Sequence, residues 1–383
     1  MKKCTVLMPL GFAFALSVTA QTFTSGSNGS LGALNVTTGN VTVDLPADGV
    51  LHYTTVNIVA GRALLFRNNP NNTAVYLLAQ GDINIAGTIE VSGGQGNSVQ
   101  GGLPGPGGFQ GGSPGSVGVT PGDGHGPGGG KAGDPGTGVT SAGGGSYATV
   151  STSGSSTRRG ATYGNSLLVP VVGGSGGGGT IGTPGNGGGG GAGGITVAST
   201  TRISVTGRIN ADGGRDGGAS NGGSGGAIRL VAPVVSGVGG LSVSAFPGGG
   251  YGRIRIDAVD RSGIGFTFYP SAAIASVGSM MLVVPAPLPR LDIVEALGNP
   301  VNEGAGPVNI QLPFGSSPNR QIKVQARDFN AVVPIVVVLT PDHGPSSSVN
   351  AEIDNSAGKN PATSTVDITL PVNEQTAIRV FTR

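Results

Sequence analysis

Four charged side chains in two short segments have the types and the spacing to bind an anionic ligand. Arg253, Arg255 and Asp257 alternate with isoleucines, so a β-strand here would place all three on the face opposite the isoleucines. Arg229 holds an equivalent position in the similar segment "IRLVAP". Because guanidinium groups bind carboxylates through paired hydrogen bonds, this cluster is a candidate site for an acidic sugar. The alternative is a solvated face with cross-strand ion pairs.

Other patterns that resemble chemical sites fail on inspection. "GPGGGKAG" resembles a phosphate-binding loop, but Lys131 is followed by Ala132 where Ser or Thr is needed, and the required earlier glycine is His125. The three histidines (His52, His125 and His343) are scattered rather than spaced as metal ligands. We therefore predict no catalytic residue, no metal site and no cofactor.

The N-terminus has the three parts of a secretory signal peptide. A basic start, "MKK", precedes the apolar run "CTVLMPLGFAFALSV", and Val18 and Ala20 supply the small residues expected before a cleavage site. We predict a signal peptide over 1–20 and a secreted protein, extracellular or at the cell surface, with the periplasm left open. An uncleaved membrane anchor is the alternative, but the apolar run is short for a bilayer.

Cleavage would change the charge and the thiol content of the chain. The sequence has 21 Lys and Arg, so loss of Lys2 and Lys3 leaves 19, against 19 Asp and Glu. A formal net charge of zero does not favour nucleic acid or an anionic membrane as a partner. Cys4, the only cysteine, is lost too, so the mature chain must be stable without disulfides. No later segment is long and apolar enough to span a membrane.

A gapless repeat indicates the elements that would position the charged cluster. "VYLLAQGDINIAGTIEVSGG" at 75–94 aligns with "ITVASTTRISVTGRINADGG" at 195–214. Three short alternating runs in each copy are typical of strands with one buried face, and they predict one turn of a parallel β-helix. For Gly87 and Gly207 we expect a turn with positive φ, which glycine adopts without strain. The predicted structural turn glycines are Gly87, Gly93, Gly94, Gly207, Gly213 and Gly214.

Looser copies extend the repeat in both directions. A third begins at Ile228 and a fourth at Ile254, and "VTVDLPADGVLHYTTVNIVAGRALLFR" supplies a longer one upstream. We therefore predict an all-β protein with a short right-handed parallel β-helix of four or five turns, within a domain over 21–284. The inward candidates upstream are Val41, Val43, Val56, Ile58, Leu64 and Phe66.

A glycine-rich insertion separates the two best copies. Residues 93–194 contain 42 of the 76 glycines, and the repeats become consecutive once 95–194 are removed. Shorter glycine-rich tracts at 215–227 and 247–253 follow the same strand of later copies, so one turn of the repeat carries every insertion. The broken triplet spacing excludes collagen. Two interpretations remain: a floppy loop, or polyproline II-like strands that pack on the solenoid and share lateral hydrogen bonds.

The composition changes after residue 284. Pro285, Pro287 and Pro289 predict a stiff connector over 285–289. Up to seven short strand candidates follow, with polar turns at close intervals: "RLDIVEA", "VNIQL", "RQIKVQARD", "VVPIVVVLT", "SVNAEID", "TSTVDITL" and "QTAIRVFT". This pattern predicts an immunoglobulin-like β-sandwich over 290–383.

The repeats "GTIEVSGG" and "GRINADGG", the tract "GGGGGAGG" and the openings "GAIRLVAP" and "YGRIRIDA" resemble bacterial secreted glycine-rich parallel β-helix proteins with a pectin-lyase-like architecture. The resemblance covers about 35–284. It implies either a surface adhesin or a carbohydrate-active enzyme. This sequence departs from the enzymes, because it has no recognisable cluster of carboxylates and no Trp to serve as a sugar platform.

Three functions follow as hypotheses. The first is a secreted, non-enzymatic structural or adhesive protein in which the solenoid is a rigid spacer or a binding scaffold. The second is a polysaccharide lyase or hydrolase, and the third is recognition of ice or mineral by an ordered glycine-rich face. Expected partners are a polysaccharide or cell-envelope component and, through exposed end strands, a second copy of the chain.

Overall fold

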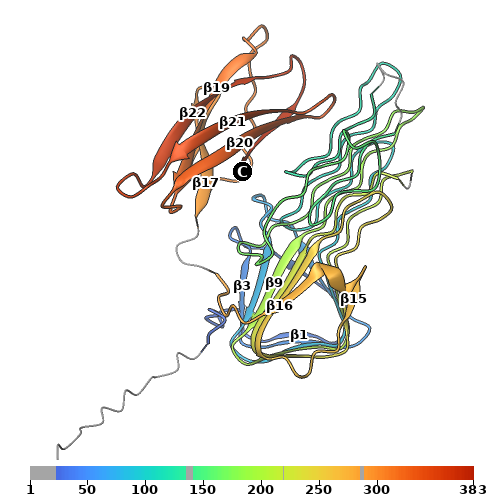
Figure 1. Ribbon diagram of the computed structural model, residues 1–383, viewed down its shortest axis with the longest axis vertical. Coiled ribbons are helices and arrows are strands. Elements are labelled where there is room, and N and C mark those ends of the chain that lie inside the picture. The colour runs from blue at the N-terminus through green and yellow to red at the C-terminus, as the bar shows by residue number, and fades with distance from the viewer. Residues whose placement is uncertain (1–22, 135–140, 219, 285–288) are drawn as a thin grey trace, which may run out of the picture.

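The computed structural model describes residues 23–134, 141–218, 220–284 and 289–383 (Figure 1). The predicted signal peptide and the connector up to residue 288 lie outside these residues. The described chain is all-β, with two sheets of parallel strands followed by two antiparallel sheets. One short 3-10 turn, η2 (Ala272–Ile274), precedes the last strand of the parallel part.

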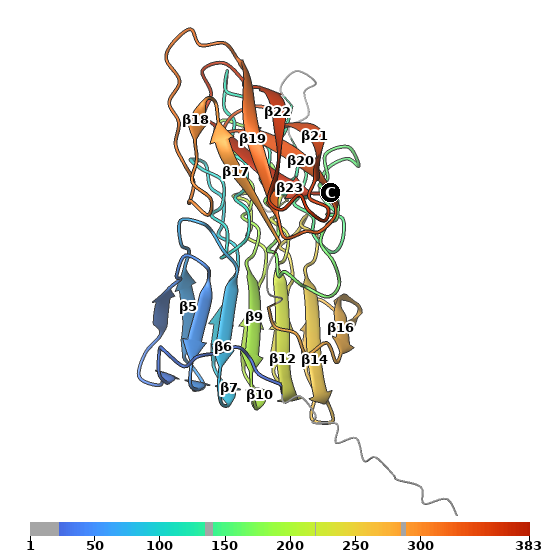
Figure 2. The same ribbon diagram turned by 90° about the vertical axis from the view of Figure 1, so that its left-hand side faces the viewer.

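The parallel strands come from successive turns of the chain, stacked side by side (Figure 2). The first sheet contains β1 (Leu34–Val36), β3 (Val50–Tyr53), β4 (Val56–Ile58), β6 (Val75–Ala79), β7 (Ile83–Ile85), β9 (Gly194–Ser199), β10 (Arg202–Val205), β12 (Ala227–Ser236), β14 (Arg253–Asp260) and β16 (Ala275–Gly278). The second contains β2 (Val41–Asp44), β5 (Ala63–Arg67), β8 (Thr88–Glu90), β11 (Arg208–Asn210), β13 (Gly240–Ser242) and β15 (Thr267–Tyr269). Because each turn contributes one strand to the second sheet, the described residues make six turns rather than the predicted four or five.

The strand register confirms the gapless repeat. Val75 pairs with Ile195 and Ile83 pairs with Ile203, so residues 120 positions apart lie side by side. Side chains follow the same register, since the amide of Asn210 donates to the carboxylate of Glu90, 120 residues earlier, at 3.1 Å. The insertion is therefore excluded from the stack, as the sequence predicted.

Apolar side chains from every turn form the inner core. All six upstream candidates point into it: Val56, Ile58 and Leu64 are fully buried, and Val41, Val43 and Phe66 pack against it. The strands β6, β9 and β12 are buried on their outer face too, which the alternating pattern did not predict. A second apolar cluster covers that outer face, and it includes Tyr147, Leu168, Val171 and Val283.

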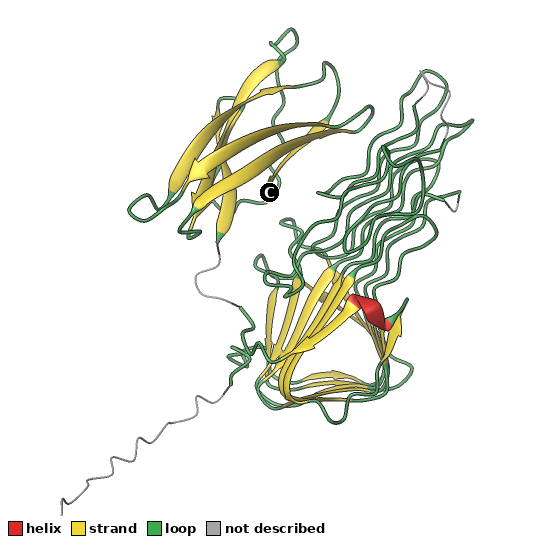
Figure 3. Cartoon of the chain, viewed as in Figure 1, coloured by secondary structure: helices red, strands yellow, loops and turns green. Residues whose placement is uncertain are grey.

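The glycine-rich segments form a structure of their own beside the sheets. We call it the glycine layer, made of the described residues within 91–193, 211–226 and 243–252. Its segments run as extended chains without regular strand assignment (Figure 3). Most of its glycines are buried, and backbone hydrogen bonds link neighbouring segments. The ordered interpretation of the insertion therefore describes the structure, and the floppy loop does not.

The C-terminal module, residues 290–383, consists of two antiparallel sheets around one apolar core. One sheet has the order β18 (Asn299–Pro300), β17 (Arg290–Ala296), β19 (Asn319–Arg327) and β22 (Ala362–Thr369). The other has the order β21 (Ser347–Asp354), β20 (Val332–Pro341) and β23 (Thr376–Thr382). Six of the seven predicted strands are present, whereas "VNIQL" at 308–312 is irregular chain.

Candidate functional site

The four charged residues of the sequence hypothesis lie on two neighbouring parallel strands. Arg229 of β12 pairs in register with Arg255 of β14, and Arg253 and Asp257 flank Arg255 at alternate positions of β14. The alternation with buried isoleucines therefore places these side chains on the outer face of the sheet, as predicted. What the sequence did not reveal is how that face is covered.

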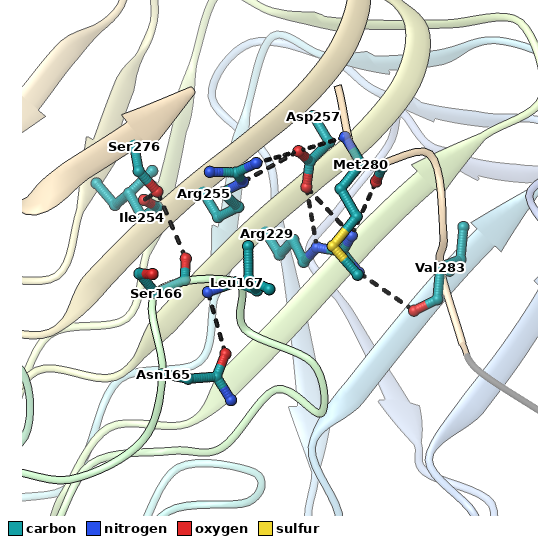
Figure 4. A network of polar contacts seen from close by, with 10 residues as sticks. All are labelled: Asn165, Ser166, Leu167, Arg229, Ile254, Arg255, Asp257, Ser276, Met280 and Val283. Atoms are coloured by element: carbon teal, nitrogen blue, oxygen red, sulfur yellow. Dashed lines mark hydrogen bonds and ion pairs between the residues drawn. The ribbon is translucent and has the colours of Figure 1, made fainter. Parts of the chain in front are cut away.

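Asp257 is the centre of the cluster (Figure 4). One carboxylate oxygen accepts from the guanidinium of Arg229 at 3.1 Å, and the other accepts from Arg255 at 2.7 Å and 3.0 Å. The backbone amide of Met280 also donates to this second oxygen, at 2.9 Å. A carboxylate shared by two guanidinium groups and an amide has most of its acceptor capacity filled.

Arg229 connects the outer face of the sheet to residues 280–283, which follow the last parallel strand. Its guanidinium donates to the carbonyl oxygens of Val283 and Met280, both at 3.2 Å (Figure 4). The side chains of Arg229 and Asp257 are both 0% exposed. Burial lowers the pKa of Arg229 from its ordinary value, and the hydrogen bond and charge of Asp257 oppose that shift.

This geometry corrects the interpretation of an open anion site. Arg229 and Asp257 are enclosed, because residues 280–283 cross over them and form hydrogen bonds with them. Arg255 keeps 13% of its side chain exposed, but it is already paired with Asp257. The arrangement resembles the alternative, cross-strand ion pairing, except that the pairs are buried rather than solvated.

Arg253 stands apart from the other three. Its guanidinium donates to the carbonyl oxygen of Tyr163 at 3.3 Å and lies 5.6 Å from the ring centroid of Tyr147. Both tyrosines belong to the glycine-rich insertion, and a contact of this kind between a cation and a ring is attractive. Arg253 thus holds part of the insertion against the sheet.

The predicted turn glycines are structural, but for a different reason from the one expected at Gly87 and Gly207. Neither has a positive φ. A Cβ on Gly87 would lie 2.2 Å from the carbonyl oxygen of Arg62, and one on Gly207 would lie 1.9 Å from that of Gly87. Consecutive turns approach so closely here that only glycine fits.

The other four predicted glycines belong to the glycine layer. A Cβ on Gly93 would lie 2.1 Å from the carbonyl oxygen of Gly190, and one on Gly213 would lie 2.0 Å from that of Gly223. Gly214 is equally close to Gly94, at 1.9 Å, whereas a Cβ on Gly94 would meet nothing closer than 3.1 Å. Chain packing within the layer, rather than turn conformation, therefore requires three of these four glycines.

Hydrogen bonds in the glycine layer repeat every three residues. In the central segment 185–193, the amides of Gly187 and Gly190 donate to one neighbour, the segment 94–97, at 2.8 Å and 3.0 Å. A second neighbour, the segment 109–112, accepts from the amides of Gly188 and Gly191. A third, the segment 221–224, accepts from the amides of Gly189 and Ala192. A polyproline II chain has three residues per turn and no internal hydrogen bonds, which matches this pattern.

The carbonyl oxygens of the same segment bind three further neighbours. They accept from amides in 102–105 and 174–177 and from the amide of Gly214. Six other segments of the same polypeptide therefore form hydrogen bonds with residues 185–193. Three of them accept hydrogen bonds from this segment, and three donate hydrogen bonds to it. Such a lattice satisfies the backbone groups of a buried chain without strands or helices.

The layer ends in a set of turns on the side away from the sheets. Segments that leave the strands return through 97–100, 116–119, 181–184 and 246–248. Two apolar side chains in these turns face solvent almost completely: Val99 is 82% exposed and Val117 is 84% exposed. Loops held by a rigid scaffold are where proteins most often place binding residues.

Within the part of the chain that the structure describes, no helix is long and apolar enough to cross a membrane. Among the same residues, no three or more His, Cys, Asp or Glu side chains come together as a group that could hold a metal ion. In comparisons with known proteins, no family model, no curated protein and no solved structure matches this chain.

Proposed function

We propose that this chain is a secreted, non-enzymatic structural or adhesive protein, in which the stacked turns and the glycine layer form a rigid scaffold for exposed loops. We propose further that the stack is a right-handed parallel β-helix and that the C-terminal module is an immunoglobulin-like sandwich. The parallel in-register turns support the first assignment. The two antiparallel sheets around a shared core support the second.

The glycine layer is the observation that carries this function. Its three tracts each connect strands of the stack, and backbone amides and carbonyls of its segments are hydrogen-bonded to neighbouring segments. Buried backbone groups that are mutually satisfied make a segment stiff, since opening one chain breaks bonds to several others. A stiff support whose far turns expose Val99 and Val117 suits presentation and spacing better than chemistry.

The enzyme hypothesis has less support from the geometry. The sequence offers no candidate catalytic residue, and in the one candidate site for an acidic sugar the side chains of Arg229 and Asp257 are enclosed. The third hypothesis gains support from one observation, because recognition of ice or mineral by glycine requires an ordered face, and the layer is ordered. We keep it as the second candidate.

A binding assay separates these functions. Purified residues 21–383 would be tested for retention on whole bacteria, on cell-wall fractions and on a panel of pectins, alginates and glycosaminoglycans. The scaffold proposal expects retention on at least one surface and no release of shorter sugars from any of them. Sustained depolymerisation would establish an enzyme instead, and inhibition of ice growth without retention would favour the second candidate.

Substitution of the exposed turn residues tests where retention arises. In a Val99→Asp/Val117→Asp variant, we expect affinity for the retained surface to fall at least about tenfold, equal to about 1.4 kcal/mol, because an apolar contact is replaced by a charge. Val372→Asp is the matched control, since Val372 is 72% exposed but belongs to the C-terminal module. Equal affinity of all three proteins would exclude these turns as the adhesive surface.

A further inference from the structure

The C-terminal module rests against the glycine layer through backbone as well as side chains. Gly122 of the layer pairs with Gly344 of the module in an isolated parallel bridge, and the amide of Gly344 donates to the carbonyl oxygen of Pro121 at 3.2 Å. A Cβ on Gly122 would lie 2.4 Å from the carbonyl oxygen of Asp342. The two surfaces therefore meet closely enough to exclude a side chain.

A buried carboxylate joins the two surfaces. Asp123 of the layer is 3% exposed and accepts from Lys131 Nζ at 2.9 Å and from the amide of Ala132 at 2.7 Å. The amide and the hydroxyl of Ser346, in the module, donate to the same carboxylate, both at 2.9 Å. Separation of the module would leave Asp123 with only its bonds inside the layer.

A buried histidine lies beside this carboxylate. His125 is 7% exposed, and its Nδ1 atom lies 2.6 Å from the guanidinium of Arg379 on β23. Because a guanidinium can only donate, Nδ1 must be the acceptor, and the imidazole is neutral. The rings of Phe109 and Phe381 meet edge to face next to this contact, with centroids 5.6 Å apart.

The charges around His125 do not favour its protonation. On the layer side are Asp123 and Lys131, which are paired with each other. On the module side is Arg379, directly in contact with the ring. The charges of Asp342, His343 and Glu374 on the module loops act on one another. Burial first, and then the charge of Arg379, lower the pKa of His125 to about 3, and Asp123 offsets only part of this shift.

From this geometry we infer that the C-terminal module is an acid-released latch, docked on the glycine layer while His125 is neutral and released when that imidazole takes up a proton. Protonation places a hydrogen on Nδ1, so the bond from Arg379 is lost and two cations face each other in a buried contact. Release exposes both groups to water. This inference does not depend on the proposed function.

The sign of the pH dependence follows from the two states of His125. In the released state the His125 imidazole, which stays on the layer, is exposed and should titrate near its ordinary value of about 6.5. In the docked state its pKa is about 3. Docking is therefore fully favoured above about pH 6.5, and its equilibrium constant falls up to about tenfold for each pH unit below that. Between pH 7 and pH 5 we expect a decrease of about 25-fold.

The experiment measures the distance between the module and the layer as a function of pH. The mature chain has no cysteine of its own after residue 20, so Cys at Val117 and Val372 can carry a donor and an acceptor dye. We expect efficient energy transfer at pH 7.5 and a progressive loss from pH 6.5 to pH 4, while far-ultraviolet circular dichroism stays constant. Constant transfer over that whole range would overturn the inference.

Variants of the contact identify the group responsible. His125→Gln keeps an acceptor for Arg379 but cannot be protonated, so its transfer should change with pH at least about tenfold less than that of the unaltered protein. His52→Gln is the matched control, since His52 lies on β3 of the first sheet and accepts from the amide of Asn28, and it should respond to acid like the unaltered protein. A pH response of His125→Gln equal to that of the control would overturn the assignment to His125.

A second variant covers the case in which His125→Gln does not fold. In Arg379→Gln the buried cation is gone, and the amide oxygen can accept from a protonated imidazole, so the acid response should again be much weaker. If Arg379→Gln released its module over the same pH range as the unaltered protein, another titrating group would be responsible and the inference would fail.

Discussion

Alanine at Gly188 should prevent the glycine layer from forming. The added Cβ would lie 1.9 Å from the carbonyl oxygen of Gly177 and 2.4 Å from its carbonyl carbon, far inside contact distance. Because Gly188 is in the central segment, no neighbour can yield without breaking its own hydrogen bonds. We expect a loss of more than about 4 kcal/mol in the free energy of unfolding, or no soluble protein.

Thermal and denaturant unfolding of purified variants would measure this effect. Gly39→Ala is the matched control, since a Cβ there would meet nothing within 4 Å and its φ is not positive. We expect Gly39→Ala to change stability by less than about 0.5 kcal/mol. Similar stability of Gly188→Ala and Gly39→Ala would show that the layer is not packed as described.

Removal of the Asp257 carboxylate should produce the second large effect. Asp257→Ala leaves the buried guanidinium of Arg229 without its counter-charge and the amide of Met280 without an acceptor. Breaking a buried ion pair from one side typically costs about 3–5 kcal/mol, and we expect a loss in that range. Segment 280–283 should also detach, which limited proteolysis would detect as new cleavage there.

Two further variants show whether burial causes the loss. Asp82→Ala removes a pair with Arg202 at 2.8 Å, but these side chains are 38% and 53% exposed rather than fully buried, so a change below about 1 kcal/mol is expected. Arg229→Met fills similar space without a charge and leaves Asp257 bonded to Arg255, so it should destabilise less than Asp257→Ala. If Asp82→Ala and Asp257→Ala had equal effects, burial of the cluster would not matter.

The sequence predicts strand pairing well because the pairing follows its period. Val75 and Ile195 align in sequence and pair in the sheet, and the same holds for Ile89 and Ile209. Equivalent apolar residues of successive turns lie side by side in the core. A shift of one residue in the strand register would turn them to the other face of the sheet. The strands of the C-terminal module follow from the same alternation, apart from the irregular chain at 308–312.

What the sequence could not predict depends on contacts between distant segments. Arg229 has the alternation of an outward residue, yet Tyr147, Leu168 and Val283 belong to segments that cover its face of the sheet. Nothing in the local pattern of β12 or β14 indicates that cover. His125 and Arg379 are 254 positions apart, and neither sequence context marks a buried contact.

The glycines show both limits and strengths of sequence reasoning. The composition leaves two interpretations of the tract open, a floppy loop and polyproline II-like packing, and the hydrogen bonds between its segments match the second. The reason expected at Gly87 and Gly207, positive φ, was wrong, because the backbone of Arg62 or of Gly87 lies too close for a side chain. When two distant segments approach closely, the only mark in the local sequence is the glycine itself.

Amide hydrogen exchange over 95–194, measured by mass spectrometry on residues 21–383, tests the central claim most directly. If the insertion is a hydrogen-bonded glycine layer, amides of 185–193 should exchange as slowly as those of β9 and β12, while the exposed turn at 97–100 should exchange fast. Exchange throughout 95–194 at the rate of an unfolded chain would contradict the layer, and with it the rigid scaffold on which the proposed function rests.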